Sequence, residues 1–194
     1  FSNAVFADLN GDGKADYIAP IPSATGFDIA ISYGDGSGGF SASPSVEVPV
    51  TTPSGSTLTR VMSFSIFDIN RDGRKDIIFM ADNPTALFAN EQSLHVMTAN
   101  TGGGYQDTIF DSFHSSVPTE KHSGYRIADT QANGTIALWL LPYNFNYSRN
   151  EPAAVSSGST KVYFSNNQGS FDLVPSLSNK YPAFFGDFNQ DGIV

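Results

Sequence analysis

A nine-residue pattern rich in aspartate recurs along the chain, and it limits the possible folds more than any other sequence feature. Residues 8–16 read DLNGDGKAD, and residues 68–76 read DINRDGRKD. The pattern begins again at residue 187, and a weakened copy begins at residue 129. The successive starts lie 60, 61 and 58 residues apart. A period this steady indicates a chain built from repeated structural units.

Apolar residues flank each copy and predict short β-strands. Phe6 precedes the first copy and Ile18 follows it, while Phe67 and Ile78 flank the second. Further along each unit, an extended apolar stretch ends in a Gly-rich turn and an aromatic residue. The three aromatic residues are Phe40, Tyr105 and Phe171. No window keeps helical spacing, so each unit is expected to contain several short strands joined by turns.

The repeat predicts an all-β fold. A unit of about 60 residues cannot bury its sheet face alone and must stack on its copies, as the blades of a propeller do. We therefore expect a partial β-propeller with about three blades and the start of a fourth. The segment 1–194 divides into expected units at 1–60, 61–121, 122–180 and 181–194, the last one truncated. Further blades are expected outside this segment. Stretches rich in Ser, Thr, Pro and Asn, at 41–60, 106–124 and 143–160, are expected to include loops.

The Asp-rich pattern places oxygen ligands at alternating positions of a tight turn. Side chains at positions one, three, five and nine can converge on one point, and the Gly at position six lets the backbone curl. Position seven can add its carbonyl oxygen. Such an all-oxygen cage suits Ca²⁺. The expected ligands are Asp8, Asn10, Asp12, the Lys14 carbonyl and Asp16 in the first loop, and Asp68, Asn70, Asp72, the Arg74 carbonyl and Asp76 in the second.

The other two copies are weaker. The fourth offers Asp187, Asn189 and Asp191 and is expected to bind weakly, because the chain stops before position nine. In the third copy Asp129 is the one carboxylate left, and Ala137 at position nine cannot ligate. Little or no calcium is expected there.

Two other interpretations share this spacing. A helical calcium hand, as in EF-hand or dockerin loops, needs an acidic ligand at position twelve, where this chain has Ala19, Phe79 and Leu140. The truncated fourth copy leaves a dockerin-like start open. Alternatively, the loops are Asx-rich turns without metal. Four ligand-type residues on alternating positions, twice over, favour a metal.

Composition excludes several classes of function. The net charge is −9, and ten Lys and Arg residues are scattered, so no basic stripe for nucleic acid exists. No apolar run approaches the roughly 20 residues that span a bilayer, so no membrane insertion is expected. With no cysteine, disulfides, thiolate zinc sites and Cys nucleophiles are ruled out.

These motifs resemble FG-GAP/VCBS-type repeats, the family that includes the calcium-bearing blades of integrin α-subunit propellers. The best matches are residues 6–16, 67–76 and 185–192, together with the Gly-Gly-aromatic turns. The resemblance implies a β-propeller with calcium on hairpin loops, in proteins as varied as adhesins, lectins and accessory modules of secreted enzymes. Residues 124–129, followed by Leu138-Trp139, are also similar to repeats of Rhs and bacterial toxin-complex proteins.

The expected function is that of a non-catalytic, extracellular or cell-surface calcium-binding module for adhesion, binding or scaffolding. Its partner, a protein or a glycan, is not readable from the sequence. No enzyme activity is expected, because the glutamates outside the loops and the histidines are scattered singly and match no recognisable catalytic motif. These are Glu47, Glu91, Glu120 and Glu151, with His95, His114 and His122.

Two alternatives remain open. The segment 139–147 offers aromatic faces, including Trp139, Tyr143 and Tyr147, beside asparagine side chains, as sugar-binding surfaces do. The same residues also suit a strand that packs on the next blade. The segment could also be the accessory propeller of a secreted enzyme or of a toxin-complex protein.

Overall fold

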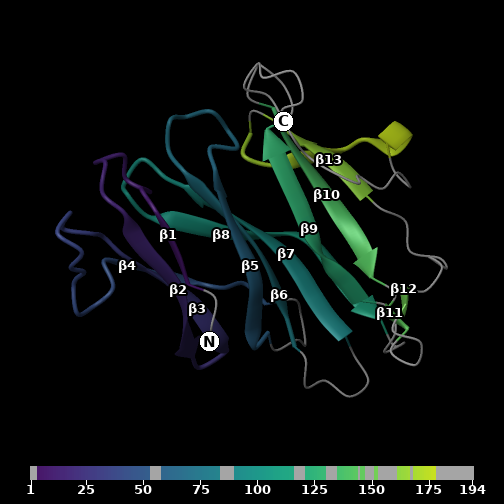
Figure 1. Cartoon of the computed structure of the whole chain (residues 1–194), viewed down its shortest axis with the longest axis horizontal. Coiled ribbons are helices and arrows are strands. Elements are labelled where there is room, and N and C mark those ends of the chain that lie inside the picture. The colour runs from purple at the N-terminus through teal and green to yellow at the C-terminus, as the bar shows by residue number, and fades with distance from the viewer. Residues whose placement is uncertain are drawn as a thin grey trace. The chain divides into compact units, whose positions relative to one another are not determined.

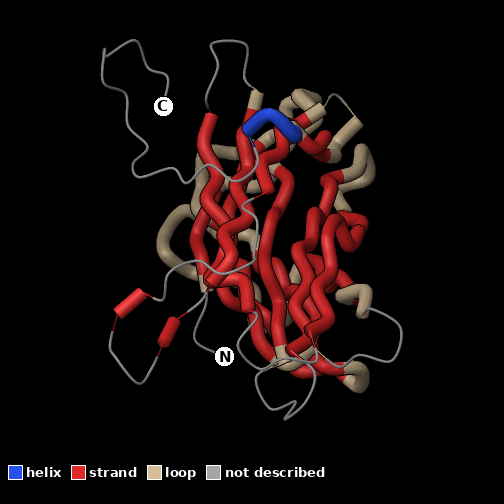
Figure 2. The backbone as a smooth tube through the Cα atoms, turned by 90° about the vertical axis from the view of Figure 1, so that its right-hand side faces the viewer, coloured by secondary structure: helices blue, strands red, loops and turns tan. Residues whose placement is uncertain are grey.

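The computed structural model describes residues 4–52, 58–83, 90–115, 121–129, 135–143, 145–146, 151–152, 161–166 and 168–177. It confirms the all-β prediction, with three four-stranded antiparallel sheets. The only helix in these ranges is a short 3-10 turn at Pro175–Leu177, drawn in blue in Figure 2. None of the described segments forms a helix long and apolar enough to cross a membrane.

The first sheet contains four strands in sequential order, coloured purple to blue in Figure 1. They are β1 (Val5–Ala7), β2 (Asp16–Ser23), β3 (Gly26–Ser32) and β4 (Val46–Pro49). The first Asp-rich loop joins β1 to β2, where Ala7 pairs with Asp16. This up-and-down order is that of a propeller blade.

The second sheet repeats the same order. Its strands are β5 (Arg60–Phe67), β6 (Asp76–Asp82), β7 (Asn90–Ala99) and β8 (Tyr105–Ser115). The second Asp-rich loop joins β5 to β6, where Phe67 pairs with Asp76. The position-nine residues Asp16 and Asp76 therefore each begin the second strand of their sheet. Strand β8 shows that much of the stretch 106–124 is extended, although its polar composition suggested loops.

The third sheet keeps the pattern with longer connections. Its strands are β9 (Lys121–Asp129), β10 (Ile136–Tyr143), β13 (Lys161–Ser165) and β14 (Phe171–Leu173). The separate pair of β11 (Phe145–Asn146) and β12 (Glu151–Pro152) lies between β10 and β13 in the sequence. The weakened third copy connects β9 to β10, and residues 130–134 within it lie outside the described part. The expected fourth unit at 181–194 is also outside it.

The chain divides into two compact units. One contains nearly all of the first two sheets, and the other contains the third sheet together with residues 69–71 and 88–90. In the first unit, the first and second sheets share one hydrophobic core. Its fully buried members include Ile18, Ile29, Ile77, Phe79 and Met97.

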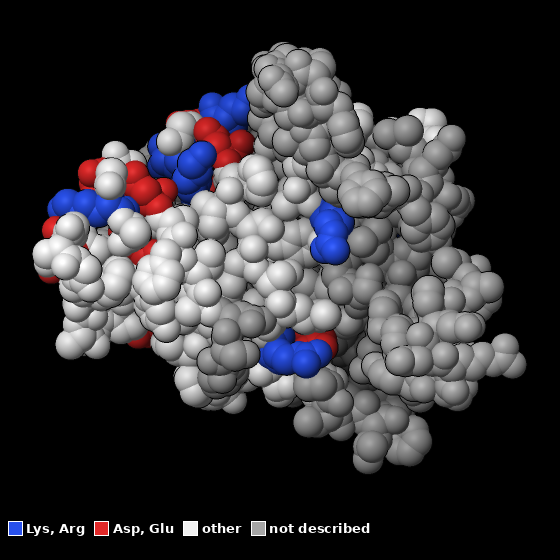
Figure 3. Space-filling view, in the orientation of Figure 1, with Lys and Arg blue, Asp and Glu red and all other residues white. Residues whose placement is uncertain are grey.

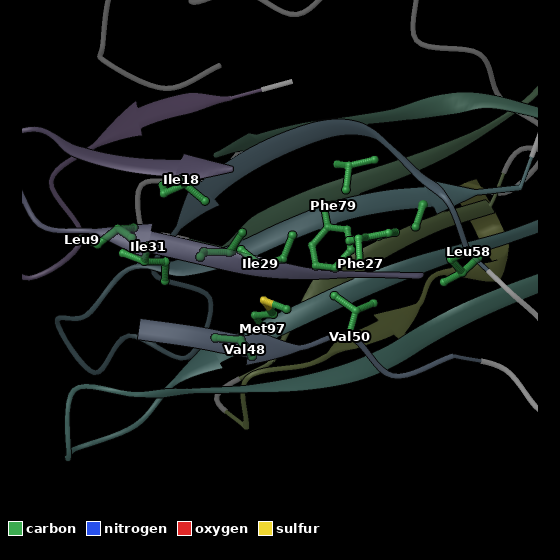
Figure 4. Packing of buried hydrophobic residues seen from close by; sticks show 13 residues of the cluster. Leu9, Ile18, Phe27, Ile29, Ile31, Val48, Val50, Leu58, Phe79 and Met97 are labelled. Atoms are coloured by element: carbon green, nitrogen blue, oxygen red, sulfur yellow. The ribbon is translucent and has the colours of Figure 1, made fainter. Parts of the chain in front are cut away.

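Ring contacts join the two sheets of this core. Figure 4 shows Phe27 of β3 beside Phe79 of β6, and their ring centroids lie 6.4 Å apart in an edge-on arrangement. Apolar burial is the main favourable term in folding, and here neither sheet could supply it alone. The shared core therefore packs together the two sheets whose first and second strands the complete Asp-rich loops connect.

Candidate functional site

Both complete Asp-rich loops have the same backbone shape. Positions four and six are left-handed in each, with φ of 77° and 80° at Gly11 and Gly13, and 61° and 84° at Arg71 and Gly73. The sequence pointed to the Gly at position six, whereas the left-handed position four was missed. Non-Gly residues rarely adopt this conformation. Its presence at Arg71 shows that the loop shape is imposed by the fold and is not a consequence of glycine alone.

In the first loop, backbone N–H groups hold the ligand-type side chains in place. The two carboxylate oxygens of Asp8 accept hydrogen bonds from the N–H groups of Gly11 and Gly13, at 2.7 and 2.9 Å. The Asn10 Oδ1 atom accepts one from Asp12 N–H at 2.9 Å. The Asp12 Oδ1 atom accepts one from Lys14 N–H at 2.9 Å. Positions one, three and five thus curl the loop through consecutive Asx turns.

The second loop keeps two of these bonds and changes a third. Asp68 accepts hydrogen bonds from the N–H groups of Asp72 and Gly73, at 3.1 and 2.9 Å, and Asp72 accepts one from Arg74 N–H at 2.9 Å. The position-seven side chain also pairs with the position-five carboxylate, because Arg74 Nη2 lies 2.6 Å from Asp72 Oδ2. In the first loop Lys14 Nζ lies 3.8 Å from Asp12 Oδ2. Position seven was expected to contribute a carbonyl, and its side chain adds a positive charge.

Position nine behaves differently from positions one to five. Asp16 is fully buried, and its carboxylate accepts hydrogen bonds from Leu9 N–H at 2.8 Å and from Gly34 N–H at 3.1 Å. Asp76 is also fully buried and accepts one from Ala99 N–H at 2.9 Å. Each carboxylate therefore ties its loop to the end of the third strand of the same sheet, a role that spacing alone did not reveal.

The chemistry of the loop side chains fits a hard cation, although their arrangement does not form a complete metal site. All the side-chain ligands are oxygen atoms, and an oxygen that accepts one N–H keeps a second lone pair. Within the described ranges, however, no three His, Cys, Asp or Glu side chains gather closely enough to hold a metal ion. The four-side-chain cage therefore stays a prediction, with positions one, three and five as its exposed part and position nine facing the interior.

In the third sheet a different hydrogen bond takes the place of the one that the position-nine carboxylate accepts in the first two sheets. Ala137 is fully buried at this position and offers no acceptor. Instead, the backbone N–H of the neighbouring Ile136 donates to Ser165 Oγ at 2.9 Å. Ser165 ends β13, so the tie again joins the start of the second strand to the end of the third. The ligand-type residues Asn133, Asp187, Asn189 and Asp191 lie outside the described residues.

A second repeated turn was not predicted as a feature of its own. Asp35, Asn100 and Asn166 follow the third strand of the three sheets. The Oδ1 atom of each accepts hydrogen bonds from the N–H groups two and four residues later, at 2.7–3.2 Å. Hydrogen bonds from the Ser37 backbone, the Ser37 hydroxyl and Gly39 N–H lower the pKa of Asp35. An Asx residue four positions before the final Gly or Ser was the available sequence signal.

Two tyrosines connect the first and second sheets beside the loops. The Tyr33 hydroxyl donates to the Gly103 carbonyl at 3.2 Å, and the Tyr105 hydroxyl donates to the Lys75 carbonyl at 3.1 Å. Burial, and then the charge of Asp16, raises the pKa of Tyr33. Burial also raises the pKa of Tyr105, with smaller contributions from Tyr33, Asp76 and Asp16. The charges of both position-nine carboxylates therefore reach this junction.

Charged side chains gather where the loops meet. Figure 3 shows acidic and basic groups interspersed along one edge of the first unit. Figure 1 places the β1–β2 and β5–β6 loops at the same edge. The remainder of this face is mostly uncharged in Figure 3. The Asp-rich loops are thus the most strongly charged part of the visible face.

One buried group of polar side chains lies apart from the loops. On β7, Ser93 Oγ lies 2.7 Å from His95 Nε2, and His95 Nδ1 lies 3.0 Å from Asp107 Oδ2 on β8. This is the connectivity of a hydrolase triad. Ser93 and His95 have no exposed surface, and the Asp107 side chain is 2% exposed. Asp107 also accepts Thr51 N–H at 2.7 Å, which links the first sheet to the second. The group is buried as a structural network would be.

Comparison with known families adds to this geometry. A model of the FG-GAP-like repeat matches residues 8–79, which include both complete Asp-rich loops. Residues 8–79 are therefore similar to an FG-GAP-like repeat. FG-GAP-like repeats form β-propeller blades, which agrees with the four-stranded sheets of residues 5–49 and 60–115. No curated protein matches the chain.

The FG-GAP-like match leaves other expectations untested. The similarity of residues 124–129 to toxin-complex repeats stays a prediction. Trp139 lies half-buried on β10, paired with Val162 and Arg126 on the flanking strands. The side chains of residues 141–147 lie outside the described part, so the expected sugar-binding role of Tyr143 and Tyr147 also stays a prediction.

Proposed function

We propose that this chain is part of an extracellular β-propeller that binds calcium through its Asp-rich loops and serves as a non-catalytic binding or scaffold module. The observation that supports it most is the repeated loop shape. Backbone N–H groups hold the side chains at positions one, three and five in the first loop, and those at positions one and five in the second. The ion would be held by Asp8, Asn10 and Asp12 in one loop, and by Asp68, Asn70 and Asp72 in the other.

Charge supplies the physical reason for an ion. Asp8, Asp12 and Asp16 place three acidic groups within nine residues. The nearby positive charge of Lys14 compensates little, because its Nζ atom lies 3.8 Å from Asp12 Oδ2. Ca²⁺ accepts six to eight oxygen ligands and tolerates irregular geometry. Extracellular sites bind it with Kd on the order of 10⁻⁴–10⁻³ M, so millimolar calcium would fill them. At tenfold over Kd, binding adds about 1.4 kcal/mol of stability per site.

The second loop is expected to bind more weakly than the first. Arg74 lies 2.6 Å from the Asp72 carboxylate, much closer than Lys14 lies to Asp12. A cation would have to compete with this guanidinium for the same oxygens. Comparing the calcium affinities of the two loops therefore tests the effect of the position-seven side chain on otherwise similar ligands.

Calcium titration by calorimetry, with thermal melting in calcium and in chelator, tests the proposal. Calcium should raise Tm, and Asp12→Asn should weaken the tighter site by about tenfold, since it removes a charge and keeps the acceptor for Lys14 N–H. Asp72→Asn should affect the weaker site. Glu47→Gln removes an exposed acid outside the loops and is the matched control. No calcium uptake and an unchanged Tm in chelator would refute the proposal.

A further inference from the structure

A small pocket lies between the first and second Asp-rich loops, within the first unit. Its volume is about 160 Å³. The residues that matter for its chemistry are Asn10, Tyr33, Arg74, Asn100, Thr101 and Tyr105, and Leu9 and Ala99 add apolar surface. Both sheets contribute to the wall, so the pocket exists because the shared core fixes the two sheets together.

Arg74 leaves one donor without an acceptor in this wall. Its Nη2 atom pairs with Asp72, but its Nε atom is shielded from solvent and has no hydrogen-bond partner among the residues that the structure describes. A buried donor that lacks an acceptor is destabilising. The Arg74 side chain lines the pocket and is 38% exposed, so a ligand in the pocket can approach its guanidinium group. A ligand oxygen there would supply the missing acceptor.

The charges around the pocket favour a neutral ligand. Arg74 is neutralised by Asp72, and the charges of Asp16 and Asp76 both act on Tyr105 in the pocket wall. No other cationic side chain is among the lining residues. An anion in the pocket would find one guanidinium that is already paired, and the negative charges of Asp16 and Asp76, which act on Tyr105, would disfavour it. The occupant should therefore carry hydroxyl or carbonyl oxygens without a negative charge.

Size and shape narrow the ligand further. The volume corresponds to roughly five water molecules, less than the 300–1,000 Å³ of a drug-sized pocket. Two tyrosine rings and two amide side chains provide both apolar faces and hydrogen-bonding groups. We propose that this pocket binds a single neutral sugar ring, with Tyr33 and Tyr105 beside its apolar face and Arg74 donating to one of its hydroxyl oxygens. The pocket shares Asn10 with the proposed first calcium site and does not include residues 139–147.

Ligand-observed NMR and calorimetry on the full chain test the site, with methyl glycosides of the common neutral hexoses and N-acetylhexosamines as probes. At least one glycoside should bind saturably. Arg74→Lys keeps a charge beside Asp72 but removes Nε, and should weaken binding about tenfold. Thr101→Phe, at an exposed rim position, should block the pocket without removing a hydrogen bond seen in the structure. Glu47→Gln, at an exposed position outside both loops and outside the pocket, should leave the affinity unchanged.

Three results would overturn the proposal. The first is the absence of binding by every glycoside at concentrations that saturate weak sites. The second is unchanged affinity in both Arg74→Lys and Thr101→Phe, with Tm and the NMR spectrum confirming that the variants fold. The third is tighter binding of acetate or methyl phosphate, which would show an anion site. Because calcium uptake is a separate measurement, failure here leaves the proposed metal-binding function standing, and the reverse also holds.

Discussion

The carboxylate of Asp16, the first residue of β2, accepts a hydrogen bond from the backbone N–H of Gly34, which follows the end of β3. Asp76 forms the equivalent bond with Ala99 in the second sheet. Both carboxylates are fully buried. The last residue of the Asp-rich pattern is thus a tie between two turns at the same end of a sheet. This tie and the contacts around it have measurable consequences.

Replacing Asp16 by alanine should destabilise the first unit even when no calcium is present. The change leaves the N–H groups of Leu9 and Gly34 without their acceptor, at about 1–3 kcal/mol for each buried donor. We expect a loss of about 2–4 kcal/mol in the free energy of unfolding, measured by urea denaturation in chelator. Glu47→Ala, which removes an exposed acid, should change it by less than about 0.5 kcal/mol. A loss seen only with calcium would assign Asp16 to metal binding alone.

Ser93 should be a structural group and not a nucleophile. Ser93→Ala removes the partner of His95 Nε2 and should cost about 1 kcal/mol of stability. The folded protein should not react with a fluorophosphonate probe, because Ser93 and His95 have no exposed surface. Ser43→Ala, on an exposed segment, is the control for stability. Labelling of Ser93 in the native protein would contradict the non-catalytic assignment.

The two junction tyrosines should make the protein less stable at high pH. Burial raises the pKa of Tyr33 and of Tyr105 in the folded state, so both stay protonated where unfolded tyrosines, near pKa 10, ionise. The unfolded state then binds fewer protons than the folded state, and stability falls as pH rises above about 10. Absorbance titration should show tyrosines that ionise late. Tyr105→Phe should reduce the alkaline decline, and an unchanged slope would refute the assignment.

The left-handed turn at position six should depend on backbone conformation alone. A Cβ added at Gly13 meets no atom within 4 Å, yet φ is 80°. Gly13→Ala should therefore cost about 1–2 kcal/mol through strain. Gly13→Asn should cost less, because asparagine tolerates this region better. Equal losses for both variants, measured as changes in the free energy of unfolding, would point to a steric cause that the structure does not show.

Much of the fold was predictable because its signals are local. The pattern around Asp8 and Asp68, with apolar flanks at a steady interval, predicted the strands, the turns between them and the division into sheets. Val46 and Val48 alternate as a half-buried strand should, and they lie in β4. The stretch 106–124 was expected to include loops because it is rich in polar residues, yet most of β8 lies in it. Strand β8 is at the outer edge of its sheet, where burial constrains composition less.

The sequence alone determined the repeat, the loop shape and the set of oxygen-bearing side chains. All three can be read from a nine-residue pattern and its recurrence along the chain. Only the tertiary structure decided which of these carboxylates face the interior. It also brought Arg74 and Tyr33 to one pocket, and it joined Ser93, His95 and Asp107. These relations depend on hydrogen bonds and packing between segments far apart in the chain, and such contacts have no period that a sequence can display.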